Sequence, residues 1–86
     1  MGTPSDLALE IRTIAVSARA AIDSSYKVGR PDVAAECASR GLTMLEGIRN
    51  RLGEDVPDEI HQQYADAHRE LTSAMVTAWG SNRRGP

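Results

Sequence analysis

The sequence predicts an all-α fold, an antiparallel up-down-up bundle of three helices at about residues 4–28, 31–52 and 56–79. Three observations lead to it. Apolar residues recur at steps of three and four within each range, which is the spacing of one helical face. Glycine or proline stands at each boundary, and the connections are short enough to make neighbouring helices antiparallel. No alternating apolar and polar run indicates a competing strand.

The first helix, residues 4–28, is predicted from its start signals and from one apolar face. Thr3 is expected to cap it, with Pro4 at the first helical position and Asp6 completing a capping box. The face, broken only by a serine, comprises Leu7, Ile11, Ile14, Ala18, Ala21, Ser25 and Val28. Gly29 can adopt the left-handed conformation that ends a helix.

The second helix, residues 31–52, begins at Pro31, which a first helical turn tolerates. Its face is made mainly of small residues: Ala34, Cys37, Ala38, Gly41, Leu45, Ile48 and Leu52. A glycine inside a helix costs about 1 kcal/mol relative to alanine. Close approach of another helix would explain Gly41, whereas the pattern gives no reason for Gly47. Gly53 is expected to end this helix.

The third helix, residues 56–79, starts in an acidic turn and repeats the spacing without interruption. Its face comprises Ile60, Tyr64, Ala67, Leu71, Ala74 and Ala78. Gly80 is expected to end it. Residues 1–80 therefore form the bundle, and residues 81–86, which have no apolar anchor, are expected to be a disordered C-terminal tail.

The composition suggests a core that depends on close helix packing. The chain has 86 residues, of which 41% are hydrophobic, but twelve of these are alanine and none is phenylalanine. A single domain of this size has modest stability, because alanine buries little apolar area. Formation of a homodimer is a plausible supplement.

Charge and cysteine content exclude several classes of function. The net charge is −2, with both signs interspersed, which argues against a nucleic-acid partner. No apolar run is long enough for a membrane span, and the N-terminal residues do not form a signal peptide. The single cysteine, Cys37, excludes an internal disulfide and favours a reducing, cytoplasmic location. Nine arginines against one lysine are typical of a high-GC genome, such as that of a bacterium or its phage.

The corner between the first two helices resembles a tetratricopeptide-type hairpin. The residues that carry the resemblance are Tyr26, Lys27, Gly29, Asp32, Ala34 and Glu36, followed by Ala38, Gly41 and Leu42. Residues 15–48 would form one repeat, with Ile22 and Gly41 departing from the residues that the family usually has there. Tetratricopeptide hairpins bind peptide segments of partner proteins, so the resemblance implies a protein-binding role.

A second resemblance covers about residues 7–78. Three-helix microtubule-interacting-and-trafficking modules have a similar hairpin and a third helix with a Tyr-x-x-Ala-x-x-Leu-like ending. Tyr64, Ala67 and Leu71 are similar to that ending, with the leucine one position late. This family also binds short segments of other proteins in grooves between helices.

The residues give no sign of catalysis, and neither a metal nor a cofactor is expected. Cys37 has no nearby base in a recognisable hydrolase pattern. The two histidines are seven residues apart on the third helix, which is too far for one metal ion without other ligands. A partner-binding groove edge is the main hypothesis, although these side chains could also simply widen the buried face. The candidate residues are His61, Tyr64, His68, Met75 and Trp79.

The sequence therefore predicts a non-enzymatic protein-interaction module, an adaptor or regulatory factor that binds a helix or peptide of another protein. A homo-oligomeric structural or assembly subunit is the alternative. Leu9 and Val16, seven residues apart and off the main face, are the candidates for self-association. They could equally mark the edge of the core.

Overall fold

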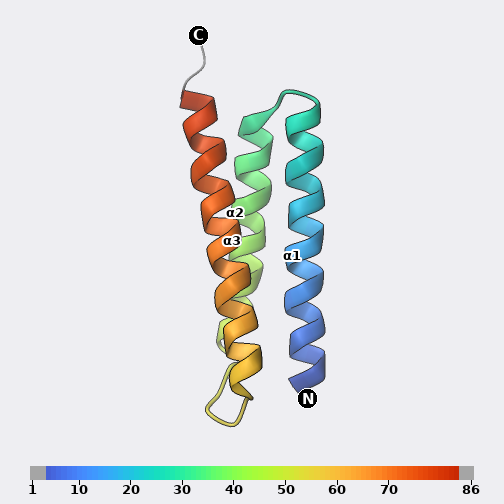
Figure 1. Cartoon of the computed structure of the whole chain (residues 1–86), viewed down its shortest axis with the longest axis vertical. Helices are drawn as coiled ribbons and strands as arrows, with labels where there is room; N and C mark the ends of the chain where they lie inside the picture. Colours follow the sequence, from blue (N-terminus) through green and yellow to red (C-terminus); the bar gives the residue numbers. More distant parts are fainter. Residues whose placement is uncertain (1–3, 84–86) are drawn as a thin grey trace.

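The computed structural model describes residues 4–83 and confirms the predicted all-α class. Three helices, α1 (Pro4–Lys27), α2 (Pro31–Arg49) and α3 (Asp58–Arg83), form an up-down-up bundle (Figure 1). The molecule is a rod of about 50 × 17 × 17 Å. One end holds the α1–α2 turn and the C-terminal end of α3, and we call it the turn end. The other holds the long α2–α3 connection, and we call it the loop end.

The α1–α2 turn confirms the role predicted for one glycine. Gly29 has a φ of +72°, in the left-handed region that favours glycine. The backbone N–H of Arg30 donates to the carbonyl of Ser25 at 2.8 Å, which closes the end of α1. Val28 was predicted on the apolar face, and this is wrong. The helix ends at Lys27, so Val28 lies in the turn and is 72% exposed.

Three other helix ends differ from the prediction. Helix α2 ends at Arg49, three residues early, and α3 begins at Asp58. Gly80 does not end α3, which continues to Arg83. Glycine permits the left-handed conformation but does not impose it, so a helix can run through it. The first half of the predicted tail is thus helical, while residues 84–86 and the predicted cap Thr3 lie outside the described residues.

The core changes composition along the rod. Towards the loop end the buried residues are large and aliphatic: Leu7, Ile11, Leu45, Ile48 and Ile60. Towards the turn end they are mostly small: Ala18, Ile22, Ser25, Ala34, Ala35, Ala38 and Ala78. The buried hydroxyl of Ser25 donates to the carbonyl of Ala21 at 2.8 Å, so it leaves no unpaired polar group.

The three helices come close together at Gly41, where the sequence predicts the close approach of another helix. A Cβ atom at this position would lie 2.8 Å from Leu71 Cδ1 and 3.0 Å from Ala18 Cβ. Gly41 therefore allows α1 and α3 to pack against the same turn of α2. No side chain lies within 4 Å of the corresponding position at Gly47, which faces outward.

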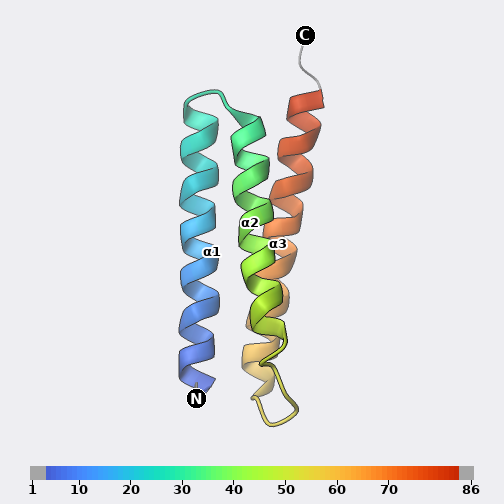
Figure 2. The same cartoon turned by 180° about the vertical axis from the view of Figure 1, so that it is seen from behind.

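Helices α1 and α3 form the smallest contact of the three pairs. Two polar contacts join them: Gln63 Nε2 donates to the carbonyl of Ala8 at 2.9 Å, and Arg19 pairs with Glu70 at 2.6 Å. Towards the turn end α3 leans away from α1 in both views (Figures 1 and 2). At that end, the side of α3 that faces away from the core is not covered by another described helix.

Candidate functional site

Apart from Tyr26 and Val28 at the α1–α2 turn, the large apolar side chains that are exposed on the described chain lie on two surfaces. The first, which we call the α3 stripe, runs along the outer side of α3. It comprises Tyr64, His68, Thr72, Met75, Val76 and Trp79. The second lies on α1 and on the groove between α1 and α2. We describe the α3 stripe first because it contains four of the five residues predicted to bind a partner.

The α3 stripe begins with an aromatic pair. The rings of Tyr64 and His68 stack with centroids 6.0 Å apart and an interplanar angle of 27°. Both side chains are half-buried. They line a shallow hollow of about 670 Å³ between α2 and α3, together with Arg49 and Arg69. This part of the stripe is consequently mixed, with aromatic rings beside two cations.

The stripe ends in an apolar patch at the turn end. Val76 is 63% exposed and Trp79 is 57% exposed, while Met75 is half-buried against the core. These three residues and Gly80 line a hollow of about 350 Å³. Met and Trp are enriched where proteins meet, because they offer large contact areas. Val76 and Trp79 are the large apolar side chains exposed on the described part of α3.

The charges beside the α3 stripe favour an anionic neighbour. The side chain of Arg49 makes no hydrogen bond or ion pair with any described residue. Arg69 has a loose contact with Asp66 at 3.7 Å, and both side chains are largely exposed. Exposed pairs of this kind contribute little free energy. Both guanidinium groups can therefore reorient towards a carboxylate of a bound molecule.

His61 is separated from the other candidate residues by its contact with the loop. Its Nε2 lies 3.0 Å from the carbonyl oxygen of Gly53, which can only accept the hydrogen bond. The ring thus holds the α2–α3 connection against the first turn of α3. This contact gives His61 a structural role that the seven-residue spacing from His68 does not reveal.

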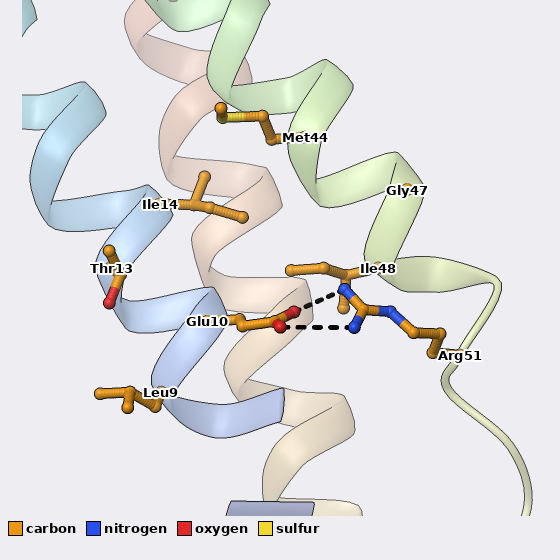
Figure 3. A pocket seen from close by; sticks show the side chains of 8 residues that line it. All are labelled: Leu9, Glu10, Thr13, Ile14, Met44, Gly47, Ile48 and Arg51. Atoms are coloured by element: carbon orange, nitrogen blue, oxygen red, sulfur yellow. Dashed lines mark hydrogen bonds and ion pairs between the residues drawn. The ribbon is translucent and has the colours of Figure 1, made fainter. Parts of the chain in front are cut away.

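The second surface is a groove between α1 and α2, on the side facing away from α3 (Figure 3). It consists of two adjoining hollows of about 490 and 300 Å³, which share Thr13, Ile14 and Met44. Gly47 forms part of its wall, and the missing side chain keeps that wall low. Cys37, predicted to be buried, is half-buried and lines the other part of the groove.

One ion pair spans this groove towards the loop end. Both terminal nitrogens of Arg51 donate to the carboxylate of Glu10, as the dashed lines in Figure 3 show. Leu9 and Met44 flank the pair and are 63% and 61% exposed. Val16 is similarly exposed on the outer side of α1. The two residues predicted for self-association thus both lie at the surface.

The sequence reasoning missed Arg49, Met44 and Val76. Each lies off the periodic apolar face of its helix, so the pattern that predicts the core gives it no role. A solitary large apolar residue on a polar face is the available signal, and Leu9 and Val16 were found in that way. Arg49 has no such signal, because its position beside Tyr64 depends on how α2 packs against α3.

A search of residues 4–83 finds no group of three or more His, Cys, Asp or Glu side chains that could hold a metal ion. Among the described helices, none has the length and apolar character needed to cross a membrane. Comparison with protein-family models, curated proteins and solved structures finds no match to this chain.

Proposed function

We propose that the chain is a non-enzymatic protein-interaction module that binds an amphipathic helix of a partner protein along the α3 stripe. The observation that carries the proposal is the exposure of Val76 and Trp79 beside half-buried Met75. Burying exposed apolar surface contributes about 25 cal/mol per Å². A tryptophan left more than half exposed therefore offers a partner a large gain in contact area.

The shape of the stripe fits one helix. Tyr64 and Trp79 are fifteen residues apart, which corresponds to about 22 Å or four helical turns. A partner helix in which apolar residues recur at steps of three and four over four turns presents a ridge of that length. The hollow at Val76 and Trp79 would receive the largest side chain of this ridge.

The charges beside the α3 stripe favour acidic residues on the adjacent side of the partner helix. Arg49 and Arg69 stand beside the aromatic end, so we infer that the partner carries Asp or Glu there. Charge complementarity of this kind contributes to orientation and association rate more than to affinity. The resemblance to two families that bind peptide segments in grooves between helices supports the same class of function.

Selection from a displayed library of four-turn helical peptides tests this proposal. We expect the enriched peptides to combine an apolar ridge with acidic residues at one end. Val76→Glu should abolish their binding, because it places a charge in the apolar patch. Val16→Glu is the matched control, since Val16 is equally exposed on α1, and it should leave binding unchanged. Enriched peptides that bind both variants equally would refute the site.

Trp79 provides a direct readout because it is the only tryptophan in the sequence. Addition of an enriched, tryptophan-free peptide should shift its fluorescence to shorter wavelength as the indole leaves water. Arg49→Glu should weaken the binding of an acidic peptide. It should strengthen the binding of a counterpart in which lysine replaces the acidic residues. If Arg49→Glu affects the two peptides alike, the inferred acidic flank is wrong.

A further inference from the structure

The outer side of α1 carries a second stripe that the proposed function does not use. We call it the α1 stripe, and its residues follow one another at steps of three and four along the helix. It comprises Leu9, Arg12, Thr13, Val16, Ala20, Asp23 and Lys27, all of which are exposed. None of these residues belongs to the α3 stripe, so the two surfaces can be occupied at the same time.

The two charges on either side of Val16 have no partner within the described chain. Neither Arg12 nor Asp23 makes a hydrogen bond or ion pair there, although five other arginines do. They are eleven residues apart, which is almost exactly three helical turns, so they project to the same side. Arg12 lies near one end of this side and Asp23 near the other. When two copies of the side run antiparallel, each arginine therefore faces an aspartate.

We propose that the α1 stripe is a homodimer interface in which α1 packs antiparallel against α1 of a second copy. A register centred near residue 18 places Arg12 of each copy beside Asp23 of the other. Two-fold symmetry then forms this contact twice, because an isologous interface pairs residue i with j and j with i.

The apolar residues fit the same register. It sets Val16 against Ala20 of the second copy, a large side chain against a small one, and repeats this contact by symmetry. Leu9 falls beside the aliphatic part of Lys27, which can cover it while the ammonium group stays in water. Thr13 and Ala20 are small enough to allow the two helices to approach closely. Charge and side-chain size therefore select the same arrangement.

A second copy of the chain carries Arg12 and Asp23 at the required spacing, so it fits this face without any assumption about another protein. A different antiparallel partner would need a base and an acid at the same eleven-residue spacing and in the same chain order. The contact spans residues 9–27, or about 27 Å of helix. An alanine-rich bundle of 86 residues also gains from burying a further apolar surface.

Sedimentation equilibrium over a wide range of protein concentration tests the interface on the full chain. We expect the wild type to form a dimer and Val16→Glu to raise its dissociation constant at least about tenfold. Val76→Glu, equally exposed on α3, is the matched control and should leave the dimer intact. Circular dichroism should show that both variants keep their helices. A wild-type chain that stays monomeric at all concentrations overturns the proposal.

Charge reversal tests the register itself. Arg12→Glu alone places Glu opposite Asp23, and Asp23→Arg alone places Arg opposite Arg12, so each should weaken the dimer about tenfold. The double variant R12E/D23R restores opposite charges at both contacts and should recover most of the wild-type affinity. Failure of this recovery, or a dimer indifferent to both single changes, refutes the antiparallel register. Peptide binding is measured separately at Trp79, so absence of the dimer would refute this inference without refuting the proposed function.

Discussion

The two ends of the bundle bury different kinds of side chain. At the loop end, Ile11, Leu45 and Ile48 are almost wholly enclosed. At the turn end, Ala34, Ala38 and Ala78 occupy the equivalent interior positions. Because hydrophobic stabilisation scales with buried apolar area, the loop end contributes most of the free energy of folding.

Apart from buried Ile22, the large apolar residues of the turn end lie at or near its surface instead. Met75, Val76 and Trp79 are adjacent to the alanine-lined core, on the outer face of α3. Under the proposed function, this division separates two tasks within one small chain. The loop end holds the fold together, and the turn end keeps its largest side chains available for contact with another molecule.

The largest expected difference between the ends comes from the same substitution made at two positions of α1. Ile11→Ala removes a side chain with 0% exposure among large neighbours, and should lower the free energy of unfolding by about 4 kcal/mol. Ile22→Ala, at the turn end, should lower it by about 2 kcal/mol, because its alanine neighbours lose fewer contacts. Urea denaturation measures both values.

Met44→Ala is the control for this pair, since Met44 is exposed on α2 and lies outside the α1 stripe, and it should change stability by less than about 0.5 kcal/mol. An Ile11→Ala variant that is unfolded in water, beside a folded Ile22→Ala, would agree with the comparison. Equal losses at the two positions would show that the ends do not differ in this way.

A second pair of substitutions tests the close approach in the middle of the rod. Gly47→Ala should stabilise the protein by about 0.5–1 kcal/mol, because its Cβ enters open space and alanine favours the helix. Gly41→Ala gains the same helical preference but places a Cβ 3.0 Å from Ala18 Cβ, which moves only with α1. We expect a net loss of about 1 kcal/mol.

Thermal unfolding of these two variants gives opposite shifts in Tm if the helices are as close as described. A stabilised Gly41→Ala would mean that Leu71 and α1 yield easily at this point.

A third test concerns the ion pair that spans the groove at the loop end. Glu10→Gln breaks the two-pronged contact with Arg51 but keeps the shape of the side chain. Both groups are about half exposed, so the loss should be below about 1 kcal/mol and should shrink as salt is added. Glu36→Gln, which breaks a more exposed pair with Arg40, is the control and should have a smaller effect. A loss comparable to that of Ile11→Ala would mean that charge, not aliphatic packing, holds this end.

The sequence was sufficient for the fold class and for most of the core, because those residues obey helical periodicity. The sequence also predicted the left-handed turn at Gly29 and the close helix approach at Gly41, since each glycine has one simple physical explanation. The end of α3 could not be predicted, because Gly80 only permits a helix to stop. Ile22 is more deeply buried than Ala21, which the pattern favoured. A small rotation of α1 decides between such neighbours, and it depends on the packing of all three helices.

The candidate site was less predictable than the core. Met75 and Trp79 were found because large apolar residues beside a core face are unusual on a helix. Arg49 joins the α3 stripe only once α3 is placed against α2, and the His61 ring contacts the carbonyl oxygen of Gly53 in the loop before α3. Which exposed residues become neighbours is a property of the tertiary arrangement.

The smallest expected effect is a pH dependence at the turn end. Arg30 donates to both carboxylate oxygens of Asp32 at the start of α2, and this hydrogen bonding lowers the pKa of Asp32 below its usual value. A carboxyl whose pKa is lower in the folded state stabilises the protein above its unfolded pKa, and this contribution disappears as the pH falls through the folded pKa. The Asp32 carboxyl should therefore titrate by NMR at a lower pH than a free aspartate. Arg30→Gln should return its pKa towards the ordinary value and flatten the acid dependence of unfolding near the α1–α2 turn. If Asp32 titrates normally in the wild type, the contact with Arg30 does not persist in solution, and α2 begins without it.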